Sequence, residues 1–467
     1  MTPDQPSGGQ ESGSGTIDVA QVIERQRMNG FVIRLVAISW IVTMFDGFDM
    51  LVLSFLAPYI RHDFGIGPVQ LGQLFGCGTV GAMIGGIGFG WLGDRMGRRP
   101  TIILSVFAFG LSSMALAFAG SIETLMALRF LNGVALGGLM PLAWALNIEF
   151  VPARFRATVV TLIMMGYTLG GAIAGPLTVW VAPHWGWHSV FLLSGIVTMP
   201  LVVLLFFLLP ESARFLAVKR RAPGQIARSL NAIERGLGAT AATIFLASDE
   251  KPATGSQNFN LSTLFEGSLR AITPLLWLAY IGSSLAIYFK TSWGPILFED
   301  VGFTRTEAAY IASVTSIGGA IAGLALMRFT DRMGPIAIAL FPLLAVPLLL
   351  LMGLADIARP GFAVLSVLSM TMIGGAHFGM HSIAGLFYPS AIRANGAGWA
   401  TSVAKIGSIA APLLGGYLLA ANLPPRQLFV LLAVAPAVCA VALMLLGRAF
   451  SARRDRAAAL EANAVLT

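Results

Sequence analysis

Charged residues are scarce in this 467-residue chain: they make up 11% of it, whereas hydrophobic residues make up 56%. A soluble domain carries roughly 25% charged residues. So few charges cannot cover a protein of this size with a polar surface, which excludes a soluble globular protein. Cysteine is scarce as well. Cys77 and Cys439 both lie in apolar stretches, which argues against a disulfide framework.

The hydrophobic residues are gathered into runs long enough to cross a bilayer, which requires a helix of about 20 mostly apolar residues. Twelve such runs predict an all-α membrane protein with twelve transmembrane helices. The runs begin near residues 31, 68, 101, 124, 157, 187, 270, 305, 335, 361, 394 and 427.

Residues 1–24 contain no hydrophobic run and are rich in Gly, Ser and Gln. We therefore expect a disordered tail there and no cleavable signal peptide. The net charge of +8 is concentrated as Lys and Arg in alternate loops and in both tails. Under the positive-inside rule this pattern places both termini and the 210–269 loop in the cytoplasm. The basic charge thus indicates topology and not nucleic-acid binding.

The chain repeats itself at an offset of 237 residues. Asp94–Gly97 recurs as Asp331–Gly334, and Val151–Ala157 is matched by Tyr388–Ala394. Matches in the same order at one offset predict two homologous six-helix halves, which in parallel-repeat transporters enclose a substrate site near the bilayer midplane. The expected order is a disordered cytoplasmic tail (1–24), an N-terminal half (25–209), a cytoplasmic loop (210–269), a C-terminal half (270–448) and a cytoplasmic tail (449–467).

The sequence Gly-Trp-Leu-Gly-Asp-Arg-Met-Gly-Arg-Arg-Pro at residues 90–100 follows the second predicted helix. It resembles the loop signature of the major facilitator superfamily. That resemblance implies that Asp94, beside Arg95, latches the two halves on the cytoplasmic side and is released during transport. Asp331 belongs to the degraded second copy of this motif. The alternative is a basic loop that serves only to set topology.

Asp46 and Asp49 lie midway through the first predicted helix. A carboxylate at the membrane centre costs about 2.5–3.5 kcal/mol, so two of them in one helix indicate a function. Their spacing places both on one face, and two close carboxylates in a low dielectric suit reversible proton binding. With Ala57-Pro58 the motif resembles the aromatic acid/proton symporter family, which implies proton coupling for both residues. The alternative is a structural pair with a buried cation.

Arg129 in the fourth predicted helix is followed by Gly133 and Gly137, whose flat face lets another helix approach closely. The arginine is then directed inward. It resembles the fourth-helix arginine of the superfamily, which implies a role in proton coupling or in neutralising substrate charge. The alternative is a side chain that extends to the membrane interface.

Two clusters close helices on the expected cytoplasmic side. Glu149 lies near Arg156 at the end of the fourth helix, and Arg393 follows Tyr388-Pro389 at the end of the tenth. Both clusters resemble the symporter family's pattern, which implies gate salt bridges and not substrate contacts. A plain solvated charge cluster is the alternative.

Two buried lysines depart from the family pattern. Lys405 stands in the eleventh helix where the family usually has an arginine, and Lys290 lies in the seventh. Such a cation either pairs with Asp46 or Asp49 or holds the substrate carboxylate, and we expect the second role for at least one lysine.

Aromatic side chains near these charges are candidates to sandwich a substrate ring, with ordinary packing as the alternative. They are Phe48, Tyr288, Trp293 and Trp399. His377 and His381 resemble a metal pair only superficially because no third ligand is evident, so we expect them to line a polar cavity.

These patterns predict a monomeric, multi-pass transporter of the bacterial inner membrane. The resemblance to the aromatic acid/proton symporter family implies that it imports hydroxybenzoate-like aromatic carboxylates with protons by alternating access, and we expect no metal or cofactor beyond the coupling proton. The alternatives are a symporter for a non-aromatic organic acid or sugar acid, an efflux antiporter, and a transporter-like receptor. No nucleophile–base set or phosphate loop indicates an enzyme.

Overall fold

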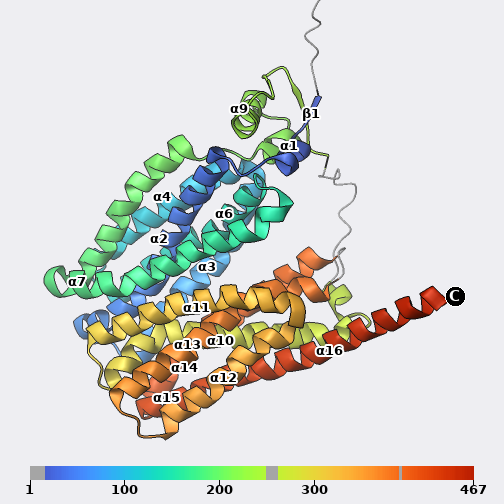
Figure 1. Ribbon diagram of the computed structural model, residues 1–467. Coiled ribbons are helices and arrows are strands. Elements are labelled where there is room, and N and C mark those ends of the chain that lie inside the picture. The colour runs from blue at the N-terminus through green and yellow to red at the C-terminus, as the bar shows by residue number, and fades with distance from the viewer. Residues whose placement is uncertain (1–15, 249–260, 389–391, 467) are drawn as a thin grey trace, which may run out of the picture.

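The computed structural model describes residues 16–248, 261–388 and 392–466, and Figure 1 shows two bundles of long helices. The first bundle contains α2 (Gly30–Phe64), α3 (Pro68–Met96), α4 (Arg98–Leu116), α5 (Ile122–Gly137), α6 (Leu139–Ile148) and α7 (Ala153–Leu208). The second contains α10 (Leu269–Asp300), α11 (Arg305–Met333), α12 (Pro335–Leu354), α13 (Arg359–Phe387), α14 (Arg393–Ala420), α15 (Pro425–Leu432) and α16 (Val434–Leu466).

The predicted twelve-helix fold is confirmed. Among the described residues, 11 segments are long and apolar enough to cross a membrane. One of them is α7, whose 56 residues are interrupted at Gly186 by non-helical backbone (φ 78°, ψ 162°). Glycine adopts this positive φ without a Cβ clash. The chain therefore turns back there, and α7 supplies two crossings in place of one.

The internal repeat reappears in the helix boundaries. Helix α11 begins and ends 237 residues after α3, and α12 and α13 begin 237 residues after α4 and α5. Two copies of one helical pattern have therefore folded into two related bundles.

Among the described residues, the closest packing across the boundary between the bundles joins α3 with α14, α7 with α11, and α2 with α10. A Cβ built on Gly72 would lie 2.6 Å from the Pro412 carbonyl oxygen, so α3 and α14 approach almost backbone to backbone. Nearby, the Arg305 guanidinium lies 4.4 Å from the Tyr59 ring centre. Figure 1 shows the bundles diverging from this far end toward the end that carries α1 and the end of α16, here called the terminal end.

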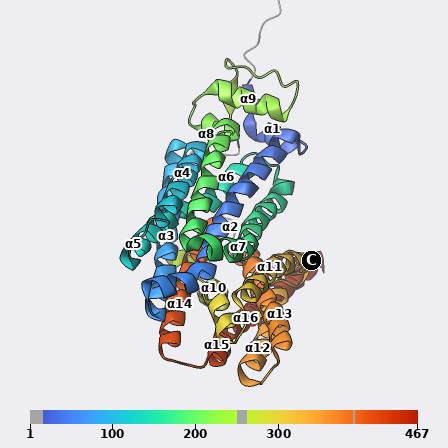
Figure 2. The same cartoon turned by 90° about the vertical axis from the view of Figure 1, so that its left-hand side faces the viewer.

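A small cap covers the terminal end of the first bundle (Figure 2). It consists of β1 (Thr16–Asp18), α1 (Val19–Arg25), α8 (Ala213–Val218), α9 (Pro223–Ile233) and β2 (Ile244–Leu246). The two strands pair in parallel, with Thr16 opposite Ile244. A 3₁₀ turn, η1 (Leu261–Phe265), precedes α10.

The cap corrects the predicted disordered tail: the prediction was wrong for residues 16–24, while residues 1–15 lie outside the described part. Val19, Val22 and Ile23 recur at helical spacing and are 0–2% exposed. They share one apolar core with α8, α9 and the first bundle. This short amphipathic stripe supplies the burial that a disordered segment lacks.

Candidate functional site

A cavity of about 760 Å³ lies between the two bundles near the middle of the long helices. Both bundles line it, the first through α2, α3, α5, α6 and α7 and the second through α10, α11, α13 and α14. Its charged lining consists of Asp46, Asp49, Arg129, Lys290 and Lys405. The structure thus brings together the five charged residues that the sequence singled out for proton coupling and substrate binding.

Asp49 and Arg129 form a buried ion pair. The Arg129 Nη1 lies 2.6 Å from Asp49 Oδ2, and its Nη2 donates to the Asp49 carbonyl oxygen at 2.8 Å. Arg129 Nη1 also donates to Asn132 Oδ1 at 3.0 Å. Asp49 is 0% and Arg129 4% exposed, so neither side chain extends to the membrane interface. Bonds from both of its terminal nitrogens orient the guanidinium, which anchors α5 to the middle of α2.

Asp46 differs from Asp49 in its partners. Within the described part of the chain, its carboxylate makes no hydrogen bond and no ion pair at contact distance, although it lies near enough to Lys405 and Asp49 to interact with their charges. It is buried, with 7% exposure, and faces the cavity. The following residue, Gly47, packs against the Tyr167 backbone, where no Cβ would fit. This close approach of α7 holds the Asp46 carboxylate at the cavity wall.

Lys290 places an amine in the cavity from the second bundle. It is 6% exposed, and the hydrogen bonds and ion pairs of the described residues give it no partner. Lys405 lines the same cavity and is half-buried. With every group ionised, three cations face two carboxylates, so the cavity carries one surplus positive charge. A buried unpaired ammonium is costly, and the charge of an organic anion would offset that cost.

The aromatic candidates divide into two groups. Tyr288 lines the cavity. Phe48 instead packs in the core, and Trp293 is 1% exposed with its Nε1 donating to the Pro412 carbonyl oxygen at 3.1 Å. Trp399 is 40% exposed and stacks on Trp277, with 6.2 Å between ring centres. The prediction that Phe48, Trp293 and Trp399 face the substrate was therefore wrong, because none of the three lines the cavity and each packs against other side chains.

Other aromatic residues line the cavity in their place. They are Phe75, Trp144, Tyr167, Tyr280 and Phe378. A sequence signal existed for the α10 members, since Tyr280, Ser284, Tyr288 and Thr291 recur at helical spacing in an otherwise apolar helix.

His377 lines the cavity from α13, and its Nδ1 lies 3.1 Å from Ser283 Oγ on α10. The His381 side chain lies outside the described part. The described residues contain no group of three side chains placed to hold a metal ion. His377 is thus a polar lining residue, as the sequence suggested, and it shares a hydrogen bond across two helices.

Comparison with known proteins decides the family. A sequence model of the Major Facilitator Superfamily matches residues 39–249 and 275–466, which is most of the chain. The protein belongs to this superfamily. Its members are transporters, which agrees with the twelve-helix fold and places the protein outside the enzymes.

Relatives with known names narrow the comparison within the superfamily. The chain is 34% identical to the 4-hydroxybenzoate transporter PcaK of Pseudomonas aeruginosa, over 92% of this chain and 96% of that one. It is 33% identical to the gallate transporter of Pseudomonas putida, over 93% and 96%. A bacterial homologue of the human lysosomal transporter Spinster, solved in an inward-facing and occupied conformation, has the same fold, with a TM-score of 0.66 and 17% sequence identity. The match covers 90% of this chain and 98% of that one. The predicted resemblance to aromatic acid transporters of the superfamily is confirmed.

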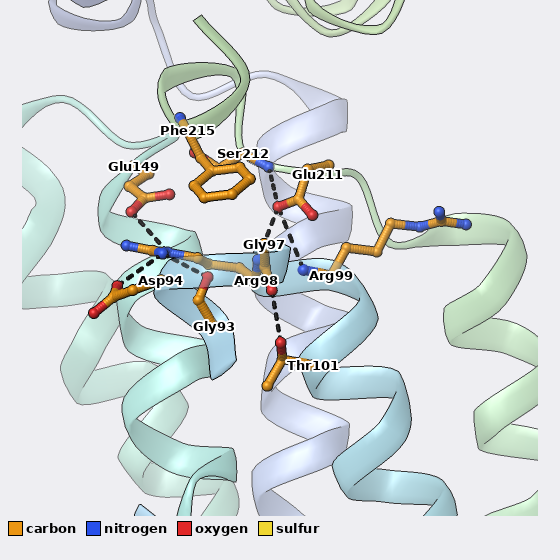
Figure 3. A network of polar contacts seen from close by, with 10 residues as sticks. All are labelled: Gly93, Asp94, Gly97, Arg98, Arg99, Thr101, Glu149, Glu211, Ser212 and Phe215. Atoms are coloured by element: carbon orange, nitrogen blue, oxygen red, sulfur yellow. Dashed lines mark hydrogen bonds and ion pairs between the residues drawn. The ribbon is translucent and has the colours of Figure 1, made fainter. Parts of the chain in front are cut away.

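The superfamily loop motif forms a polar network at the terminal end (Figure 3). Arg98 is its centre: its Nε lies 3.2 Å from Glu149 Oε1, and its Nη1 lies 2.9 Å from Asp94 Oδ1 and donates to the Gly93 carbonyl at 2.8 Å. Asp94 is 76% exposed and pairs within its own half. Glu149 pairs with Arg98, which belongs to the motif but was not among the gate residues predicted from the sequence.

Glu211 closes this network from the segment after α7. Its Oε1 accepts from the backbone N–H groups of Arg98 at 3.0 Å, Arg99 at 3.4 Å and Ser212 at 2.9 Å. Burial raises the pKa of the Glu211 carboxyl, although these hydrogen bonds favour its ionised form. The carboxylate caps the N-terminus of α4 and thereby ties the cap to the loop motif.

The remaining gate candidates have separate partners. Arg156 Nη2 lies 2.8 Å from Glu24 Oε1 of the cap, and Arg95 lies 4.7 Å from the Trp91 ring centre. Arg393 donates through Nε to the Tyr388 carbonyl oxygen at 3.3 Å. The side chain of Asp331 lies outside the described part. Arg156 thus ties the first bundle to the cap. A gating role for Arg95, Arg156, Asp331 and Arg393 stays a prediction.

Proposed function

We propose that the protein is a proton-coupled symporter that imports hydroxybenzoate-like aromatic carboxylates across the bacterial inner membrane by alternating access. The observation that carries this proposal is the buried Lys290 amine, which has no hydrogen-bond or ion-pair partner among the described residues and lies in a cavity that both halves line. The relatives named as 4-hydroxybenzoate and gallate transporters support an aromatic acid as the substrate.

The direction of opening follows from the distribution of charge. Basic residues are concentrated in the loops and tails of the terminal end, which the positive-inside rule assigns to the cytoplasm. Since the bundles meet at the far end and diverge toward the terminal end (Figure 1), we interpret this arrangement as an inward-facing state. Transport then requires the far-end contacts to open and the terminal end to close around Asp94 and Arg98.

The charged residues divide the work in this scheme. In the outward-facing state Asp46 takes up a proton, because its carboxylate has no ion-pair partner among the described residues that a proton would have to displace. Lys290 then binds the substrate carboxylate, and Tyr167 and Tyr288 offer ring faces from opposite halves. After the halves rock, Asp46 releases its proton to the cytoplasm and the substrate leaves. Asp49 and Arg129 act as a fixed pair that aligns α2 with α5.

The stoichiometry determines the driving force. One monocarboxylate carried with one proton is electroneutral and responds to the pH gradient alone. Each additional proton would couple transport to the membrane potential at about 2.3 kcal/mol per 100 mV.

Uptake into energised membrane vesicles tests this function. The panel should contain labelled 4-hydroxybenzoate, benzoate, gallate and a non-aromatic sugar acid, each with and without a protonophore. We expect accumulation of at least one aromatic acid that the protonophore abolishes. Accumulation of the sugar acid alone, or accumulation indifferent to the protonophore, would contradict the proposal.

Replacing Lys290 by alanine tests the carboxylate contact. A hydrogen bond to a charged group contributes about 1.5–3 kcal/mol, so we expect the apparent KM for the aromatic acid to rise about 10- to 150-fold. Lys219→Ala, at the exposed end of α8, is the matched control and should leave KM unchanged. An unaltered KM in Lys290→Ala would exclude a direct carboxylate contact by this residue.

A further inference from the structure

The cavity contains a second polar group that this transport scheme does not use. Ser283 of α10 is 4% exposed and is hydrogen-bonded through Oγ to His377 Nδ1 of α13. Most other cavity hydroxyls donate to a carbonyl of their own helix, as Thr291, Ser316 and Ser408 do. Ser283 is instead hydrogen-bonded to a side chain of a neighbouring helix, and both residues line the cavity.

Ser283 stands in a defined relation to Lys290. The two residues are seven positions apart, so they lie on one face of α10 with a rise of about 10.5 Å between them. The intervening Ile287 and Tyr288 also line the cavity. The two polar groups therefore face the cavity from one wall, about two helical turns apart along α10.

The chemistry of a serine hydroxyl suits a phenol. The hydroxyl has one donor and two acceptor positions, and the bond to His377 uses only one of them. Whether Ser283 donates to His377 or accepts from it, Ser283 Oγ can still form a hydrogen bond with a ring hydroxyl. The neighbouring Tyr280 is a weaker candidate, because its hydroxyl already donates to the Met380 carbonyl oxygen at 2.6 Å.

We propose that the Ser283–His377 pair binds the ring hydroxyl of the substrate while Lys290 binds its carboxylate. The pair thereby selects aromatic acids whose hydroxyl lies opposite the carboxylate. This inference rests on the proposed function, since it assumes that an aromatic carboxylate occupies the cavity. A hydroxyl adjacent to the carboxylate falls short of Ser283, so 2-hydroxybenzoate binds no better than benzoate.

Competition measurements test the pair directly. Uptake of labelled 4-hydroxybenzoate is measured against unlabelled 4-hydroxybenzoate, 2-hydroxybenzoate and benzoate. We expect wild-type protein to prefer the 4-hydroxy compound about fivefold over the other two, because one net hydrogen bond contributes about 1 kcal/mol. In Ser283→Ala the preference falls to about twofold or less, and the apparent affinity for benzoate is unchanged.

Matched variants separate recognition from structure. Ser366→Ala, a buried serine on α13 that bonds the Phe362 carbonyl outside the cavity, should retain the preference. His377→Asn, which keeps a hydrogen-bond partner for Ser283, retains most of it, and His377→Leu loses it. Equal weakening for all three acids in Ser283→Ala, or a preserved preference, would overturn the pair's role and leave the proposed function intact. Failure of wild-type protein to take up any aromatic acid would instead contradict the proposed function itself.

Discussion

Replacing Asp46 by asparagine is expected to abolish accumulation driven by a pH gradient while the protein stays folded in the membrane. Asparagine has nearly the same shape as aspartate but does not take up a proton. A gradient of one pH unit stores about 1.4 kcal/mol per proton, enough for about tenfold accumulation. The variant should therefore reach no more than equal concentrations on both sides, whatever gradient is imposed.

The same variant should still exchange substrate. Exchange of labelled for unlabelled acid requires the loaded carrier to alternate but moves no net protons. Because Asp46 makes no ion pair or hydrogen bond with the described residues, asparagine breaks no contact there. Asp356→Asn, which alters an exposed carboxylate paired with Arg426, is the matched control and should accumulate normally. Normal gradient-driven accumulation in Asp46→Asn would remove this residue from the coupling mechanism.

Replacing Asp49 by asparagine is expected to abolish transport for a different reason. It leaves the Arg129 charge buried without its partner, and breaking a buried pair costs about 3–5 kcal/mol. We therefore expect both accumulation and exchange to be lost. The apparent melting temperature of the purified protein in detergent should fall as well, in contrast to Asp46→Asn.

A double variant identifies the origin of that loss. Replacing both members of a buried pair is often nearly neutral, because no uncompensated charge remains. Asp49→Asn combined with Arg129→Gln should thus recover most of the melting temperature. If the double variant is no more stable than Asp49→Asn, the ion pair is not what holds α2 against α5. If Asp49→Asn alone transports normally, Asp49 has no essential role.

Much of the fold follows directly from the sequence, and the reason is the bilayer. A helix that crosses lipid needs a long apolar run, so the runs beginning at Pro68, Arg305 and Pro335 coincide with helices that begin at those residues. The charged site was predictable for the same reason. A charge inside an apolar helix is costly enough to indicate function, and Asp46, Asp49 and Lys290 do face one cavity.

The orientation of the aromatic rings was not predictable. The membrane helices are apolar on nearly every side, so no hydrophobic stripe indicates which face turns toward the cavity. Phe48 and Trp293 lie close in sequence to cavity residues, yet both point into packed surfaces. Tyr167 could not be predicted as a cavity residue, because nothing in the surrounding sequence distinguishes it from a packing residue.

The partners at the terminal end were also beyond sequence reasoning. Glu149 has Arg154 and Arg156 nearby in sequence, but it pairs with Arg98, 51 residues away. Arg156 pairs with Glu24, because α1 folds back onto the first bundle. Short-range charge patterns predict that a cluster exists, whereas its pairings depend on how distant segments meet.

The most direct test of proton-coupled aromatic acid symport uses purified protein in proteoliposomes with an imposed pH gradient. With the interior alkaline, we expect labelled 4-hydroxybenzoate to accumulate about tenfold per pH unit and the interior to acidify at the same time. A protonophore should abolish the accumulation, and reversing the gradient should drive the acid outward. Uptake that is unaffected by the gradient, or that proceeds without acidification, would contradict the account.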